Sequence, residues 1–154
     1  MNEVLLIAGL PGSGKTFLRA ELERQGYVVF DDHKAQAHDD SPHFWKSRHF
    51  DTLLLRLREG TRCAVTDIDF CHTRARVEAE ATLHERVPVL RLEWRFFAND
   101  PATCDVNIRY RNREHLDRDL RKMYEYSTCY SIPSGATVLP VVSARESGGG
   151  PTTR

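Results

Sequence analysis

The sequence has 154 residues, of which 40% are hydrophobic and 29% are charged, and this balance predicts one globular domain with its own core. Its 22 Lys and Arg residues are matched by 22 Asp and Glu residues, which argues against strong non-specific attraction to nucleic acid. The apolar runs are shorter than the roughly 20 residues that cross a membrane, and no two of the four cysteines have a Cys-x-x-Cys spacing. We therefore expect a cytoplasmic protein with free thiols and no membrane partner.

Short aliphatic runs alternate with segments of helical periodicity. Strands are expected at 3–8, 27–30, 63–66, 87–97 and 136–142. Helices are expected at 15–24, 44–58 and 74–86, from 101 through an arginine-rich segment, and at 117–129. On the helix at 74–86, we expect Val77, Ala81 and Leu83 to face the core. This alternation predicts a parallel sheet flanked by helices, in which ligands bind beyond the carboxyl ends of the strands.

A glycine-rich loop follows the first expected strand and has the sequence GLPGSGKT, which matches the pattern G-x-x-x-x-G-K-[ST]. Glycines let the backbone N–H groups turn toward phosphate oxygens, and the next helix adds its positive end. Lys15 is expected to reach the β- and γ-phosphates, and Thr16 to hold Mg²⁺. Contacts to the phosphates of ATP are expected from Gly9, Pro11, Gly12, Ser13, Gly14, Lys15, Thr16 and Phe17.

Carboxylates close the second and third expected strands. Asp31 and Asp32 follow the strand at 27–30, where one of them could accept the proton of an acceptor hydroxyl; a turn cap is the alternative. Asp67 closes the strand at 63–66 and is expected to hold Mg²⁺ through water. The residue after it is Ile68, whereas many NTP-hydrolysing proteins have an Asp-Glu pair at such a strand end. This pattern favours a kinase over a motor or a GTPase.

Arginines after Pro101 could form a lid over the transferring phosphoryl group. The candidates are Arg109, Arg111 and Arg113, and a solvated basic helix is the alternative. Four further residues are candidates for binding the acceptor: Asp32, Arg74, Arg76 and Trp45. For the two arginines among them, ordinary surface charge is an equally good interpretation.

These segments resemble the P-loop kinase domain of bacteriophage polynucleotide 5′-hydroxyl kinase and related small P-loop kinases. Besides the phosphate loop, the resemblance rests on the acidic pair Asp31-Asp32 and on the segments 65–69, 104–111 and 120–124. It implies a three-layer α/β P-loop NTPase fold of the kinase type, with a five-stranded parallel sheet in the order 2-3-1-4-5 and a short helical lid. It also implies that Asp31 is the general base and that Arg111 clamps the phosphate, with Arg113 in reserve.

We expect a kinase domain at 1–142, with its lid at about 99–116, and a disordered polar tail at 143–154. The expected activity is transfer of the γ-phosphoryl group of ATP to a hydroxyl of a nucleic acid, either a 5′ end or a hydroxymethylated base such as those of phage DNA. The alternatives are a small-molecule kinase for a nucleoside, sugar or antibiotic, and a non-catalytic ATP-binding switch. A basic track from Arg74 and Arg76 to the lid would favour nucleic acid, whereas a closed pocket under 33–49 would favour a small molecule. The oligomeric state stays open.

Overall fold

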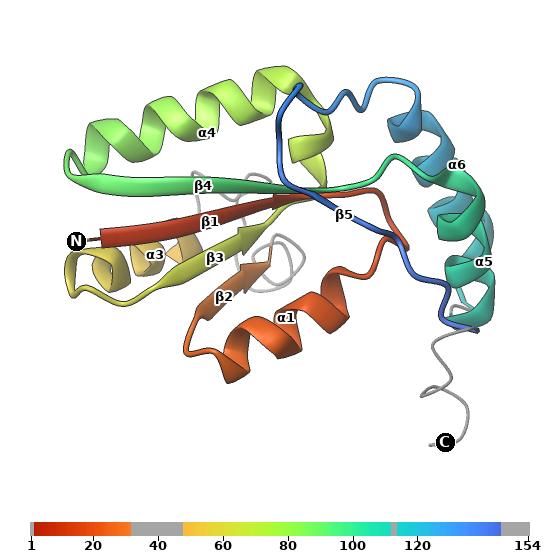
Figure 1. Ribbon diagram of the computed structural model, residues 1–154, viewed down its shortest axis with the longest axis horizontal. Helices are drawn as coiled ribbons and strands as arrows, with labels where there is room; N and C mark the ends of the chain where they lie inside the picture. The colour runs from red at the N-terminus through yellow and green to blue at the C-terminus, as the bar shows by residue number, and fades with distance from the viewer. Residues whose placement is uncertain (1, 32–47, 112–113, 146–154) are drawn as a thin grey trace.

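The architecture is described by a computed structural model, which covers residues 2–31, 48–111 and 114–145 (Figure 1). One sheet contains five parallel strands in the order β2-β3-β1-β4-β5. The strands are β1 (Asn2–Ala8), β2 (Val28–Asp31), β3 (Cys63–Thr66), β4 (Leu90–Phe97) and β5 (Val138–Leu139). The helices are α1 (Lys15–Arg24), α3 (Arg48–Arg58), η2 (Ile68–Cys71), α4 (Thr73–Arg86), α5 (Pro101–Arg111) and α6 (Leu116–Ser127). The predicted parallel sheet and its strand order are confirmed.

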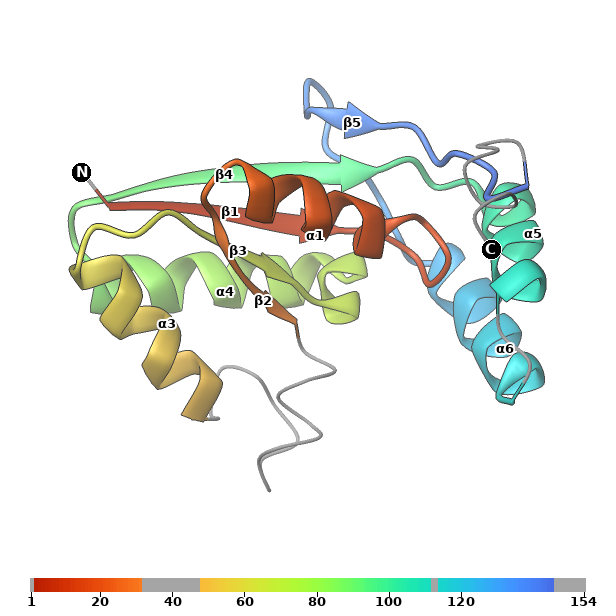
Figure 2. The same cartoon turned by 90° about the horizontal axis from the view of Figure 1, so that it is seen from below.

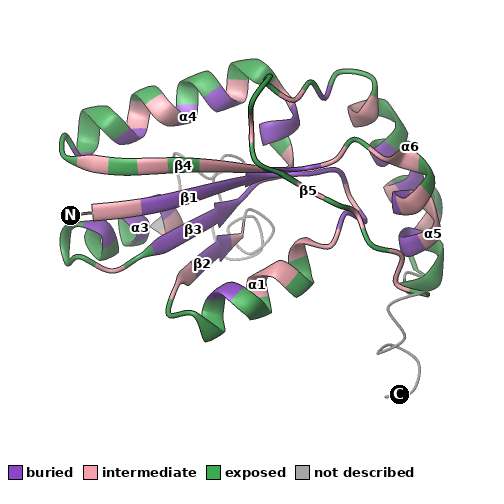
Figure 3. Ribbon diagram, in the orientation of Figure 1, coloured by how far each residue is buried: buried purple, intermediate pink, exposed green. Residues whose placement is uncertain are grey.

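Helices on both faces of the sheet give three layers (Figure 2). α3 and α4 pack on the face that carries Val4 and Leu6 of β1. α1 packs on the opposite face, where Leu22 joins Leu5 and Ile7. β1 is therefore apolar on both sides, as a central parallel strand must be, and the buried residues concentrate in β1 and β3 (Figure 3). α5 and α6 lie past the carboxyl ends of the strands (Figure 1).

Two strands are shorter than expected, and prolines explain both differences. β5 covers only Val138–Leu139 of the expected 136–142. Pro140 follows directly and has no N–H to continue the ladder. β4 begins at Leu90, whereas the strand was expected from 87, and Pro88 lies in the part that is not strand.

The expectation for the buried face of α4 was wrong at two of three positions. Val77 is 62% exposed and Ala81 is also exposed, whereas the buried residues are Arg76, Ala79 and Leu83. Alanine, arginine and glutamate make up much of this helix, so its apolar pattern is too weak to define a face.

The helix expected at 44–58 is described from Arg48 onward, and 44–47 lie outside the described residues. All four cysteines are free. Three of them, Cys63, Cys71 and Cys104, are buried, and burial raises the pKa of each thiol to about 12. In the described ranges, no helix has the length and apolar character to span a membrane.

Candidate active site

The glycine-rich loop joins β1 to α1 at the carboxyl edge of the sheet (Figure 1). Its backbone turns through Gly12 and Gly14, whose φ angles of 84° and 109° lie in the left-handed region that glycine tolerates. Within the described part of the chain, no side chain caps the start of α1 and its first turn holds no acidic residue. The positive end of α1 is therefore open toward the loop, as an anion site requires.

Two side chains of the loop also suit a phosphate ligand. Lys15 Nζ donates to the carbonyl oxygens of Gly9 and Leu10 at 2.7 and 3.0 Å, so the lysine ammonium group lies against the loop. Ser13 is 1% exposed, and its Oγ has no hydrogen-bond partner among the described residues. A buried hydroxyl without a partner is costly, and a phosphate oxygen would satisfy it. The loop therefore fits the predicted binding of ATP phosphates.

Close packing leaves no room for side chains at two glycines of the loop. A Cβ on Gly9 would lie 2.6 Å from Ser13 Oγ. A Cβ on Gly12 would lie 2.7 Å from the carbonyl oxygen of Cys104 and 2.9 Å from Ile108 Cγ1. Since Cys104 and Ile108 belong to α5, the phosphate loop and the predicted lid helix are in direct contact.

This contact distinguishes the lid arginines from one another. Residues four and seven positions apart share one face of a helix, so Arg111 lies on the stripe of α5 that carries Cys104 and Ile108. Burial raises the pKa of Cys104, and the nearby charges of Lys15 and Arg111 partly offset this rise. Arg109 points elsewhere: its Nε lies 2.5 Å from Asp105 Oδ1 in an exposed ion pair. Arg111 is therefore the better-placed of the two to act near the loop.

The predicted carboxylates lie at the same edge of the sheet as the loop. Asp31 ends β2 and stands in register with Thr66, the residue before Asp67. Arg19 of α1 lies 3.8 Å from Asp31 Oδ2 and ties this carboxylate to the helix after the phosphate loop. Asp67 is 4% exposed, and its carboxylate accepts a hydrogen bond from the Asp69 amide at 2.8 Å. This bond caps the start of the short helix η2, which was not predicted. Thr16 is exposed on the first turn of α1, and Pro11 is half-buried in the loop.

The two arginines proposed for acceptor binding have different environments. Arg76 is 6% exposed, and its guanidinium donates to the carbonyl oxygens of Phe70 and Ser131 at 2.6 and 2.8 Å. These bonds favour a structural role for Arg76 over contact with an acceptor. Arg74 is exposed and pairs with Glu78 one turn along α4, so the two arginines form no continuous basic track. The remaining candidates Asp32, Trp45 and Arg113 lie outside the described residues.

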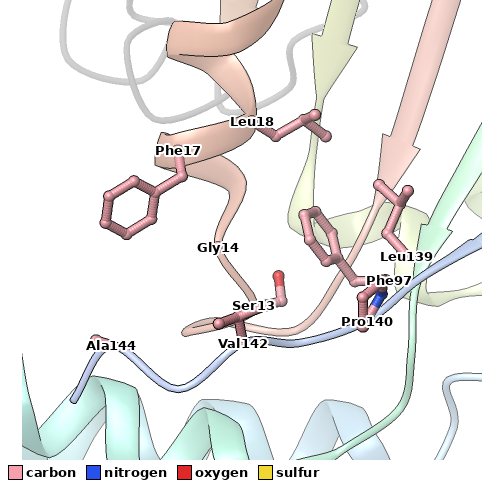
Figure 4. A pocket seen from close by; sticks show the side chains of 9 residues that line it. All are labelled: Ser13, Gly14, Phe17, Leu18, Phe97, Leu139, Pro140, Val142 and Ala144. Atoms are coloured by element: carbon pink, nitrogen blue, oxygen red, sulfur yellow. The ribbon is translucent and has the colours of Figure 1, made fainter. Parts of the chain in front are cut away.

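A pocket of about 330 Å³ opens beside the phosphate loop (Figure 4). Its lining comes from the phosphate loop with the start of α1, from the end of β4, and from β5 with the segment that follows it: Ser13, Gly14, Phe17, Leu18, Phe97, Leu139, Pro140, Val142 and Ala144. Most of these side chains are apolar, and Phe17 is 72% exposed at the mouth. Sequence reasoning identified only the members that belong to the loop or follow it directly, because the others look like ordinary core or loop residues. A phenylalanine directly after the motif was the available signal.

A polar group that the sequence did not single out lies between η2 and α6. Tyr126 donates to Asp69 Oδ1 at 3.3 Å, and burial, followed by the Asp69 charge, raises the pKa of the phenol to about 12. The His72 ring packs edge-on against Tyr126, with 4.9 Å between centroids, and its Nδ1 lies 3.3 Å from Cys129 Sγ. Tyr126 therefore keeps its hydroxyl proton at neutral pH.

Comparisons with known proteins agree with this architecture. The sequence matches no family model and no curated protein. The structure is similar to a gluconokinase from Sinorhizobium meliloti 1021, with 17% identity and a TM-score of 0.60 over 92% of this chain and 83% of that one. It is also similar to a chain of the Pnkp1/Rnl/Hen1 RNA repair complex, with 14% identity and a TM-score of 0.58 over 86% of this chain and 48% of that one.

A third similar structure is the tunicamycin resistance protein of Deinococcus radiodurans, with 17% identity and a TM-score of 0.52 over 88% of each chain. The chain has the α/β P-loop NTPase fold. At these low identities the likeness extends to the fold alone, so the activity has to be argued from the site itself.

Proposed function

We propose that the protein is a kinase that transfers the γ-phosphoryl group of ATP to a hydroxyl. The observation that carries this proposal is the contact of the phosphate loop with Cys104 and Ile108 of α5. By helix periodicity, Arg111 lies on the same stripe of α5 as these two residues. A hydrolase needs a residue that positions water, whereas a kinase needs cations around the transferring group and a base for the acceptor. In our proposal the lid spans about 99–116 within a domain predicted at 1–142, and Ala144, from the segment expected to be a disordered tail, also lines the pocket.

Each residue at the edge of the sheet then has a distinct task. Lys15 exchanges its two carbonyl partners for phosphate oxygens, and Arg111 neutralises charge that spreads over the transferring group. Asp31, oriented by Arg19, accepts the proton of the incoming hydroxyl. Mg²⁺ supplies neutralising charge on the phosphates when it is bound, and Thr16 and Asp67 are the residues that would hold it, Asp67 through water.

The apolar pocket beside the loop suits the base of the nucleotide. Planar bases bind in clefts that are mostly apolar, and Phe17 offers an aromatic face at the mouth of this one. The pocket begins at Ser13 and Gly14, so a base placed there stays within reach of phosphates on the loop (Figure 4).

For the acceptor, the surroundings of Arg76 favour a small hydroxyl compound such as a sugar or nucleoside. A nucleic acid would need a continuous track of exposed cations. Arg76 does not extend such a track, because its guanidinium donates to carbonyl oxygens of the protein. In our proposal the acceptor binds beyond β3, where Asp69 and Tyr126 offer groups that can hydrogen-bond hydroxyls. A nucleic-acid end or modified base is the second candidate, supported by the sequence resemblance.

Transfer of labelled γ-phosphate from ATP to a panel of acceptors tests the proposal. The panel contains sugars, nucleosides, a 5′-hydroxyl oligonucleotide, the same oligonucleotide with its 5′ end blocked, and a blocked duplex with hydroxymethyluracil. We expect label on a small acceptor and a loss of about a hundredfold or more in Lys15→Ala, because one transition-state cation is removed. Lys122→Ala is the matched control, since Lys122 is an exposed lysine on α6.

Asp31→Asn should bind ATP and fail to transfer. Normal transfer by Asp31→Asn would assign the base elsewhere. Label on DNA alone would select the second candidate. ATP binding without labelling of any acceptor would favour the non-catalytic switch over a kinase.

A further inference from the structure

One buried polar residue of α5 contacts two segments that the proposed function uses separately. Asn107 is 6% exposed. Its Nδ2 donates to the carbonyl oxygen of Gly12 at 2.9 Å and to that of Val142 at 3.0 Å. Its Oδ1 accepts from the amide of Ala144 at 2.6 Å. All three bonds go to backbone groups, so they fix the path of the chain rather than a neighbouring side chain.

The two segments are the phosphate loop and the far wall of the apolar pocket. Gly12 belongs to the loop, and Val142 and Ala144 line the pocket opposite Phe17 (Figure 4). β5 ends at Leu139, so the wall lies beyond the strand ladder that anchors the rest of this segment to β4. Asn107 therefore provides a direct link between the wall and the loop.

The amide side chain of Asn107 matches the hydrogen-bonding groups around it, whereas an aspartate or a leucine would not. The site presents two acceptors and one donor, and asparagine offers two N–H donors and one oxygen acceptor. An aspartate would set a carboxylate oxygen against the two carbonyls of Gly12 and Val142. A leucine of similar size would leave one buried and two part-buried backbone groups without these bonds, at a cost for each of them.

We propose that Asn107 is a positioning residue for the nucleotide base. It holds the wall formed by Val142 and Ala144 at a set distance from the phosphate loop, so that one ligand occupies the pocket and the loop together. The inference rests on the proposed function, because it needs a ligand with a base and a polyphosphate. Asn107 touches neither reacting atoms nor acceptor in this proposal and acts through the backbone of its partners.

Binding of ATP compared with binding of inorganic tripolyphosphate tests the inference. Tripolyphosphate uses the loop alone, so the ratio of its Kd to the Kd of ATP reports what the base adds. In Asn107→Ala this ratio should fall by about tenfold, the size expected for losing one to two well-formed hydrogen bonds to the wall. Any weakening through Gly12 affects both ligands and cancels in the ratio.

Asn99→Ala is the matched control. Its amide also donates to two backbone carbonyls, those of Ser127 and Tyr130 at 2.9 and 3.1 Å, and none of these residues lines the pocket. This variant should lose stability and keep the wild-type ratio. A ratio that stays unchanged in Asn107→Ala, or that falls equally in both variants, would overturn the inference and give Asn107 a structural role only.

Hydrogen exchange in the wild-type protein decides the case if Asn107→Ala does not fold. ATP should slow exchange of the Ala144 amide, and tripolyphosphate should not; equal effects of the two ligands would overturn the inference. Failure of the proposed function has a different signature, because a wild-type protein that binds neither ligand removes both proposals. Equal affinity of the wild type for the two ligands removes the base position and leaves the phosphate loop intact.

Discussion

Replacing Gly12 by alanine tests how closely α5 packs against the phosphate loop. Gly12 has a φ of +84°, and the left-handed region costs a residue with a Cβ about 1–2 kcal/mol. The new Cβ would also lie 2.7 Å from the Cys104 carbonyl oxygen and 2.9 Å from Ile108 Cγ1. Overpacking of this kind typically adds about 1–3 kcal/mol. We therefore expect Gly12→Ala to lower the free energy of unfolding by about 2–5 kcal/mol.

Gly60→Ala is the matched control for the backbone contribution. Gly60 has nearly the same φ, +85°, and no heavy atom of the described residues lies within 4 Å of a Cβ built there. Urea unfolding without nucleotide should show a loss of about 1–2 kcal/mol for this variant, since only the backbone strain applies. Equal losses in the two variants would refute the tight contact between α5 and the loop. The assignment of Arg111 to the site would then lose its main support.

Three further predictions concern the lid, the thiols and pH. Arg111→Ala should slow phosphoryl transfer by about a hundredfold or more, whereas Arg109→Ala should have a small effect, which steady-state kinetics of both variants will check. A thiol reagent at about pH 8 should modify Cys129 quickly and the three buried thiols only as the protein unfolds, because thiols with a pKa of about 12 are almost wholly protonated there. Hydrogen bonds from the Tyr124 hydroxyl and then from Arg109 lower the pKa of Asp105. The ionised carboxylate therefore stabilises the folded state at pH values above about 3.9, the pKa of an aspartate in the unfolded chain. The difference in unfolding free energy between wild type and Asp105→Asn should accordingly shrink as the pH falls below about 4.

The sheet and the phosphate loop could be predicted from the sequence because their signals are local. Buried parallel strands are short aliphatic runs, and the loop needs glycines at fixed places next to Lys15. The carboxylates Asp31 and Asp67 followed from the same logic, since each stands directly after a strand. Where local chemistry was overlooked, as at Pro140, the strand boundary was wrong.

The role of Asn107 could not be predicted because its partners are distant in the sequence. Its bonds join residues 95 and 35 positions away, and nothing in the neighbourhood of a polar helix residue indicates that backbone carbonyls will meet it. The pocket beside the loop is a similar case, because its apolar lining is assembled from three separate segments. Such features depend on tertiary packing, which a single sequence does not display.

Arg76 and Arg74 illustrate how packing separates two residues that the sequence treats alike. Burial lowers the pKa of the Arg76 guanidinium, and this buried cation is held by the carbonyl oxygens of Phe70 and Ser131. Because each buried acceptor left without its partner costs about 1–3 kcal/mol, Arg76→Ala should lower the free energy of unfolding by about 2 kcal/mol or more. Arg74→Ala should change it by about 0.5 kcal/mol or less, since its pair with Glu78 is exposed.

Arg76→Lys adds a test that distinguishes a structural arginine from one that binds the acceptor. Lysine keeps the charge, yet one ammonium group cannot reproduce the planar fork that spans the two carbonyls, so most of the stability loss should remain. An arginine that served as a cation for the acceptor would behave in the opposite way. In that case lysine would keep both stability and much of the activity, and alanine would raise the KM for the acceptor without lowering the stability. Urea unfolding and acceptor kinetics of the three arginine variants together decide whether Arg76 belongs to the core or to the acceptor site.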